Sequence, residues 1–194
     1  MGKGRLEAFS DGVIAIIITI MVLELKVPHS ATLEALSEVW PVMLCYVLSF
    51  IYVAIYWNNH HHIMHAVRKV DGAVLWANMH LLFWLSLVPF MTSWMGENHF
   101  ETLPVALYGF VLFMAGFAYY ILERSLLRLH GNESTLAQAL GTRFKDKLSI
   151  ILYIAAIALA FFDRRLAIGI YVLVALLWLI PDRRIERVLH DLAE

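Results

Sequence analysis

The sequence predicts an all-α membrane protein that forms one domain over residues 1–194 and crosses the bilayer six times. Its side chains are 61% hydrophobic and 16% charged, whereas soluble domains are roughly 45–50% apolar and about 25% charged. The apolar residues gather in six runs that approach the length of a spanning helix, about 20 residues. The net charge of −1 argues against a nucleic-acid partner, because such binding needs a basic surface.

The six apolar runs are separated by polar segments, and each run is interpreted as one helix. The predicted spans cover residues 9–25, 40–56, 73–94, 103–122, 148–162 and 166–180. The second span is expected to continue as a polar helix over residues 58–65, and Pro89 is expected to kink the third span. A charged connector over residues 123–147, broken at Gly131-Asn132, follows the fourth span. Asp163-Arg164-Arg165 predicts a tight turn between the last two.

The distribution of basic residues supports six spans with both termini in the cytoplasm, because cytoplasmic loops carry an excess of Lys and Arg. In this arrangement one face keeps only Lys26, Arg164 and Arg165. The other face collects Lys3, Arg5, Arg68, Lys69, Arg124, Arg128, Arg143, Lys145, Lys147, Arg183, Arg184 and Arg187. The first apolar run is expected to stay as a helix and not to be removed as a signal peptide, because Asp11 interrupts it. The expected location is a bacterial inner membrane.

The first span combines an acid with a long apolar run, which is costly unless the acid finds a partner. On a helix turning about 100° per residue, an apolar stripe forms one side, and Ser10 and Asp11 point away from it. The stripe consists of Gly12, Ile16, Thr19, Ile20, Leu23 and Val27. The hydroxyl of Thr19 either faces a symmetry axis or bonds back to the carbonyl of Ala15. Spacing alone is also compatible with an ordinary packed helix.

A motif in the first three spans resembles a known family of channels. The motif comprises Arg5, Phe9, Ser10 and Asp11, followed by Ile16, Thr19, Ile20 and Leu23, and later by Trp57, His61, Asp71, Asn78 and the Pro89-Phe90-x-Thr92 stretch. With six spans overall, the chain resembles the transmembrane protein 175 family of potassium channels, in particular its single-repeat bacterial members. The likeness is dense over the first three spans and rests on hydropathy over the last three.

This resemblance implies a homotetramer in which four copies of the first helix line a central pore for potassium ions. By this likeness Ile16 forms the narrowest hydrophobic ring, Ile20 and Leu23 form further rings, and Thr19 adds a layer of hydroxyl groups. An apolar constriction can gate by dewetting, and hydroxyl groups can replace part of an ion's hydration shell. The sequence contains no Thr-Val-Gly-Tyr-Gly filter loop. The expected activity is passive conduction without a cofactor, and the chain is not expected to be an enzyme.

The same resemblance gives the charged end of the motif a structural role. Arg5, Ser10 and Asp11, together with Phe9, are expected to hold the first helix against the second and third. The expected partners are Trp57, His61, His65 and Asn78.

Other functions remain open from the residues alone. A proton- or cation-coupled transporter is the main alternative, although only Asn78 and His80 lie as polar candidates inside the third span. His60-His61-His62 with His65 resembles one box of the membrane di-iron enzymes, which need several boxes, and the same tract could respond to pH. A haem held by His80 is a further option. The single cysteine, Cys45, allows no intramolecular disulfide.

Overall fold

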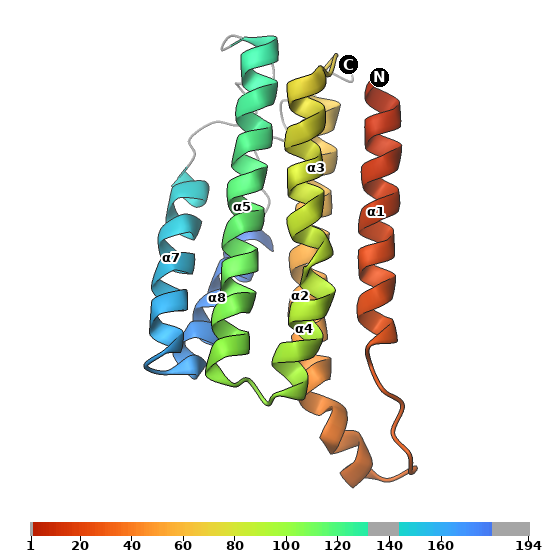
Figure 1. Ribbon diagram of the computed structural model, residues 1–194, viewed down its shortest axis with the longest axis vertical. Helices are drawn as coiled ribbons and strands as arrows, with labels where there is room; N and C mark the ends of the chain where they lie inside the picture. Colours follow the sequence, from red (N-terminus) through yellow and green to blue (C-terminus); the bar gives the residue numbers. More distant parts are fainter. Residues whose placement is uncertain (1, 132–143, 180–194) are drawn as a thin grey trace.

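The structure is a computed structural model that describes residues 2–131 and 144–179, and within these ranges it contains helices and no strand. The elements are α1 (Lys3–Leu23), α2 (Leu33–His65), α3 (Gly72–Ser86), α4 (Val88–Glu97), α5 (Thr102–His130), α7 (Phe144–Ala160) and α8 (Arg164–Leu179). The long helices run side by side and form one elongated bundle (Figure 1). The chain is therefore all-α, as predicted.

The second predicted span is part of a much longer helix. α2 has 33 residues, and its extension to His65 over residues 58–65 is helical as predicted. Its start differs from the prediction, which placed a loop up to Glu38. Thr32 caps the helix, because its side-chain oxygen accepts the N–H of Ala35 at 3.3 Å. This bond satisfies one of the N–H groups that a helix start leaves without an intrahelical partner.

The third predicted span is interrupted near Pro89, as predicted. α3 ends at Ser86 and α4 begins at Val88, with Pro89 in the first turn of α4. Proline has no N–H, and its ring displaces the carbonyl four residues earlier, so the α-helical ladder cannot continue. At the other end, Asp71 caps α3 by accepting the N–H of Val74 at 2.9 Å.

In the C-terminal half, some helix bounds and turns match the prediction and others differ from it. α5 has 29 residues and includes the first part of the predicted connector. It ends at Gly131, whose φ of 87° is a left-handed conformation that glycine adopts without strain. The turn before α8 forms as predicted, and the carboxylate of Asp163 accepts the N–H of Arg165 at 2.8 Å. Predicted features at Asn132, Arg143, Ile180, Arg183, Arg184 and Arg187 lie outside the described residues.

Length and composition identify the segments that can cross a membrane. Four segments of the described chain qualify: α1, α2, α5 and the continuous pair α3 and α4. α7 and α8 have 17 and 16 described residues, near the lower limit of roughly 17 residues for a span. The chain is a multi-pass membrane protein. Residues 148–162 and 166–180, which were expected to form the last two spans, overlap α7 and α8, and neither helix is among the four segments that qualify.

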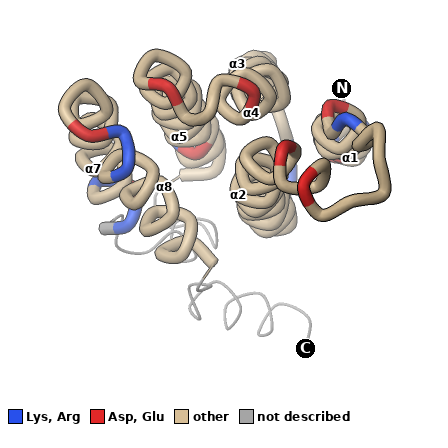
Figure 2. The backbone as a smooth tube through the Cα atoms, turned by 90° about the horizontal axis from the view of Figure 1, so that it is seen from below, with Lys and Arg blue, Asp and Glu red and all other residues tan. Residues whose placement is uncertain are grey.

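α1 lies at one edge of the bundle and α7 and α8 lie at the other. α1 contacts α2, α3 and α4, whereas α7 packs against α5 and α8 (Figures 1 and 2). Two ion pairs join neighbouring elements at the end where α1 finishes. Lys26 pairs with Glu97 of α4, and Arg164 of α8 pairs at 2.7 Å with Glu101, the residue before α5. Figure 2 views this end of the bundle.

Candidate functional site

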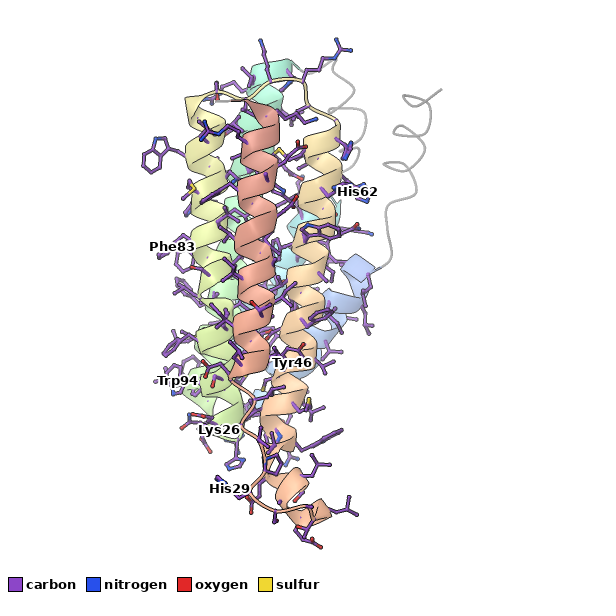
Figure 3. The ribbon with its side chains drawn as sticks, turned by 90° about the vertical axis from the view of Figure 1, so that its right-hand side faces the viewer. Lys26, His29, Tyr46, His62, Phe83 and Trp94 are labelled. Atoms are coloured by element: carbon purple, nitrogen blue, oxygen red, sulfur yellow. The ribbon has the colours of Figure 1, made fainter. Side chains whose placement is uncertain are left out.

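The two sides of α1 differ in exposure while both are largely apolar. Leu6, Ser10, Ile14, Ile17 and Met21 are buried against the neighbouring helices. On the opposite side the exposed fractions are 58% for Ile16, 41% for Ile20 and 79% for Leu23. Figure 3 looks onto the edge of the bundle that α1 forms, and no other helix of the described residues lies in front of α1. α1 therefore carries an uncovered apolar stripe along the edge of the bundle.

Thr19 lies on the same uncovered stripe and is exposed. Its hydroxyl donates to the carbonyl of Ile16 at 2.8 Å, one residue nearer than the Ala15 carbonyl considered from the sequence. This bond gives the hydroxyl proton an acceptor within the helix. The lone pairs of the Thr19 oxygen are then the part of the side chain that can accept a hydrogen bond or coordinate a cation.

The buried side of α1 is tied to α2 and α3 by three polar side chains that are at most 1% exposed, Ser10, His60 and Asn78. The Asn78 amide nitrogen donates to the Ser10 hydroxyl at 2.9 Å, and that hydroxyl donates to the Leu6 carbonyl at 2.8 Å. His60 Nε2 lies 2.8 Å from the Asn78 amide oxygen. Because an amide oxygen only accepts, the imidazole donates this bond. Every member of this Ser10–Asn78–His60 chain has a partner.

A second contact between α1 and α2 lies at the surface. The indole Nε1 of Trp57 donates to Asp11 Oδ1 at 3.0 Å. The Trp57 ring stacks on His61 with a centroid distance of 5.7 Å, and the His61 and His65 rings are 4.4 Å apart. The structure thus brings together Ser10 with Asn78 and Asp11 with Trp57, as the sequence interpretation expected.

Among the described residues, the others that were expected to hold α1 make no side-chain hydrogen bond to Ser10 or Asp11. His61 and His65 are exposed and make no hydrogen bond to Ser10 or Asp11 within the described residues. One residue along a helix changes direction by about 100°, so His60 faces the core and takes the buried position instead. Arg5 and Phe9 lie on the exposed side of α1, and the Arg5 side chain has no hydrogen bond or ion pair in the described part of the chain.

Sequence reasoning did not identify a second buried polar cluster, which joins α2, α4 and α5. The Thr92 hydroxyl lies 2.6 Å from Ser49 Oγ, which lies 3.0 Å from the hydroxyl of Tyr108. Thr92 belongs to the motif of the third span, but Ser49 and Tyr108 stand alone in apolar runs. Hydroxyl groups inside spanning segments were the available signal, because such groups need partners in a membrane.

The histidines show no metal centre in the described residues, where no group of three or more His, Cys, Asp and Glu side chains could hold a metal ion. His80, considered as a haem ligand, accepts the indole N–H of Trp84 at 2.9 Å on the same helix. That bond gives His80 a local structural role.

Comparisons with known proteins agree with this arrangement. The family described as "Endosomal/lysosomal potassium channel TMEM175" matches residues 5–89. A potassium channel of Chryseobacterium sp. is 57% identical over 191 residues, which are 98% of this chain and 100% of the relative. The crystal structure of a lysosomal potassium-selective channel TMEM175 homolog from Chamaesiphon minutus superposes with a TM-score of 0.79 at 28% identity, covering 92% of this chain and 96% of that one.

A more distant relative carries a different name. The human endosomal/lysosomal proton channel TMEM175 is 37% identical over 86 residues, which are 38% of this chain and 17% of the human protein. Fold and matches together define a membrane protein of the ion-channel class. The chain belongs to the TMEM175 family.

Proposed function

We propose that the chain is a potassium-selective cation channel that conducts passively through a central pore lined by the first helix of four identical copies. The relative at 57% identity is named a potassium channel, and the structural neighbour is described as potassium-selective. The observation that carries the proposal is the uncovered side of α1, on which Ile16, Ile20 and Leu23 are exposed in a single copy.

The two sides of α1 support this use of the helix. The buried side holds α1 in its own subunit through packing and the Ser10–Asn78–His60 chain. The opposite side is left for neighbouring copies around an axis. There Ile16 forms the narrowest ring, with rings of Ile20 and Leu23 farther along. A pore walled by such rings holds water poorly when narrow, so a small change in width changes conduction steeply.

Thr19 gives the apolar constriction a polar element beside Ile16. Its hydroxyl is already bonded to the Ile16 carbonyl, which fixes the position of its oxygen. Four such oxygens around an axis replace part of the hydration shell of a passing ion. Potassium holds its water less tightly than sodium and therefore loses less on entry. This difference favours potassium without a loop of backbone carbonyls.

The same proposal includes the location of the channel, its permeant ion and conduction without a cofactor. The channel lies in a bacterial inner membrane with both termini in the cytoplasm. The segments at the end of the bundle where α1 begins carry most of the basic residues, as cytoplasmic loops do. Among the described basic residues, Lys26 and Arg164 pair with Glu97 and Glu101 at the opposite end, where Arg165 follows Asp163 in the turn before α8. Potassium is the permeant ion, and conduction uses no cofactor.

Flux through liposomes tests the transport claim. Purified protein is reconstituted with potassium inside and the impermeant cation N-methyl-D-glucamine outside, without a proton or sodium gradient, and a voltage-sensitive dye reports the potential. A passive potassium channel generates an inside-negative potential that vanishes when the potassium concentrations are equal. A flux that appears only when a proton or sodium gradient is also imposed would instead identify a coupled transporter and contradict the proposal.

The mass of the purified protein in detergent tests the assembly separately. Light scattering that subtracts the bound detergent gives the protein mass, which should equal four chains of 22.2 kDa. A monomer or dimer that still conducts potassium would reject the central pore of four α1 helices while leaving the transport claim standing.

A further inference from the structure

A cavity between α2, α5, α7 and α8 lies away from the uncovered stripe of α1. Its empty volume is about 620 Å³, including the part open to solvent. Its walls consist of Tyr52, Ile55, Tyr56, Asn59, Phe113, Gly116, Tyr119, Tyr120, Glu123, Asp146, Ile150, Tyr153 and Trp178. The side chains that line it are buried or half-buried. The proposed conduction path uses none of them.

The wall of this cavity combines aromatic rings with two carboxylates. Five tyrosines, Phe113 and Trp178 supply the rings, and Glu123 and Asp146 supply the acids. Glu123 is only 4% exposed. Aromatic faces attract organic cations through their quadrupole, and carboxylates accept the N–H groups of an ammonium ion. This combination favours a ligand that carries an amine in an otherwise apolar setting.

The acids of the cavity lie at the depth of lipid headgroups. α5 begins at Thr102, and Glu123 lies far along the same helix. At a rise of 1.5 Å per residue, the two are separated by roughly 32 Å along the axis, close to the thickness of the hydrocarbon core, about 30 Å. Asp146 lies at the start of α7 and lines the same cavity. An amine bound here is therefore at the level where phospholipid headgroups reside.

Two basic side chains stand against the rings of the cavity. Arg124 lies over the Tyr120 ring at 5.4 Å, and its Nε donates to the Tyr120 hydroxyl at 2.9 Å. Lys145 Nζ lies 6.0 Å from the centre of the Trp178 ring. Acids in the wall with basic groups beside it match a zwitterion whose amine enters the cavity and whose phosphate stays outside.

We propose that this cavity binds a phosphoethanolamine group, with the amine toward Glu123 and Asp146 and the phosphate toward Arg124 and Lys145. The source is either the headgroup of phosphatidylethanolamine in the bilayer or the free headgroup in solution. The apolar part of the wall, Ile55 and Ile150 among it, then contacts the carbon atoms of the ligand.

Native mass spectrometry of the delipidated full chain tests the proposal. The protein is titrated with phosphatidylethanolamine and, in parallel, with phosphatidylglycerol, which carries a phosphate but no amine. Phosphatidylethanolamine should bind more tightly, by about tenfold if the amine forms one good contact with a carboxylate. Equal affinity for the two lipids would overturn the proposal.

Substitutions locate the site. Glu123→Gln and Asp146→Asn should each remove most of the preference for the amine-bearing lipid, whereas Glu34→Gln, at an exposed acid at the start of α2, should keep it. Gly116→Ala adds a methyl group 3.6 Å from the Tyr56 hydroxyl and 4.0 Å from Tyr153, which is ordinary contact, and it should weaken binding by filling space. If Glu123→Gln does not fold, Asp146→Asn and Gly116→Ala decide. Unchanged lipid preference in Asp146→Asn together with unchanged binding in Gly116→Ala would overturn the assignment.

Competition with soluble O-phosphoethanolamine separates the two sources. Displacement of the bound lipid at millimolar concentration shows that the headgroup alone occupies the cavity. Retention of the lipid shows that phosphatidylethanolamine itself is the ligand. Displacement that is equally strong in Asp146→Asn would place the headgroup elsewhere and contradict the proposal.

Discussion

Trp57 donates its indole N–H to the carboxylate of Asp11 across 3.0 Å, and this bond ties the first half of α1 to α2. The preceding residue, Ser10, faces the buried side of the helix and bonds to Asn78 of α3. Both attachments lie in the N-terminal half of α1. The second half, which carries Ile16 and Thr19, packs against the other described helices through the apolar side chains of Ile14, Ile17 and Met21.

Replacement of Asp11 tests the surface attachment. Asp11→Ala should lower the free energy of unfolding in detergent by about 1 kcal/mol, the usual contribution of one such bond, and should reduce the yield of assembled protein. Asp11→Asn keeps an oxygen that can accept from Trp57 and should lose less. In a double-mutant cycle, Trp57→Phe should add little to Asp11→Ala. Fully additive losses would show that the two residues do not act through this bond.

Asn78→Ala should be more damaging than loss of the surface contact. It leaves Ser10 and His60 without the bonds to Asn78 in a buried layer, and a buried group that loses its partner costs roughly 1–3 kcal/mol. The matched control is Asn58→Ala on the exposed side of α2, which should change the melting midpoint little. Thermal unfolding followed by tryptophan fluorescence provides the comparison. Equal midpoints for the two variants would contradict a role for this layer.

The sequence predicted helix ends correctly where a single residue determines the backbone conformation. It failed where the rotation of a helix about its axis determines which side chain is buried. Pro89 interrupts the third span and Gly131 ends α5 because their backbone chemistry allows little else. His61 was expected as a partner from the family resemblance, whereas the rotation of α2 within the bundle buries His60 instead. The start of α2 was misplaced because Glu34, Ser37 and Glu38 interrupt the apolar pattern between the cap at Thr32 and the predicted start at residue 40.

The candidate site was predictable in part. The division of α1 into two sides follows from its periodicity, and the structure shows Ser10 on the buried side and Ile16 on the exposed one. The role of Ile16 as a pore constriction stays a prediction, since it depends on neighbouring copies. The cavity at Glu123 could not be predicted, because its walls come from four helices that are distant in the sequence.

The ion pair between Arg164 and Glu101 should make the stability of the fold depend on pH in the acidic range. The hydrogen bond and charge of Arg164 lower the pKa of Glu101 in the folded state. The pair therefore contributes above the unfolded pKa, about 4.3, and the contribution disappears as the pH falls through the lower folded value. The effect is small because the pair is exposed. Melting midpoints between pH 7 and pH 3 should fall less in Arg164→Gln than in the native chain, and parallel curves would contradict the coupling.

Ile16→Asn should increase conductance several-fold. An amide at the narrowest ring lets water enter the constriction and removes the cost of dewetting. Ile151→Asn is the matched control, because Ile151 is similarly exposed, at 63%, but lies on α7 at the far edge of the bundle. Single-channel recordings in planar bilayers measure both. If both variants conduct like the native protein, Ile16 does not line the narrow part of the path.

Thr19→Ala should lower the preference for potassium over sodium severalfold while current continues to flow. The methyl group of alanine cannot coordinate an ion, so a partly dehydrated potassium ion loses the oxygens that replace its lost water beside Ile16. Thr19→Ser keeps a hydroxyl that can bond to the Ile16 carbonyl as Thr19 does, and it should keep the preference. Reversal potentials under potassium–sodium bi-ionic conditions give the permeability ratio. A ratio that is lowered equally by serine and alanine would mean that side-chain shape at position 19, and not its oxygen, determines selectivity.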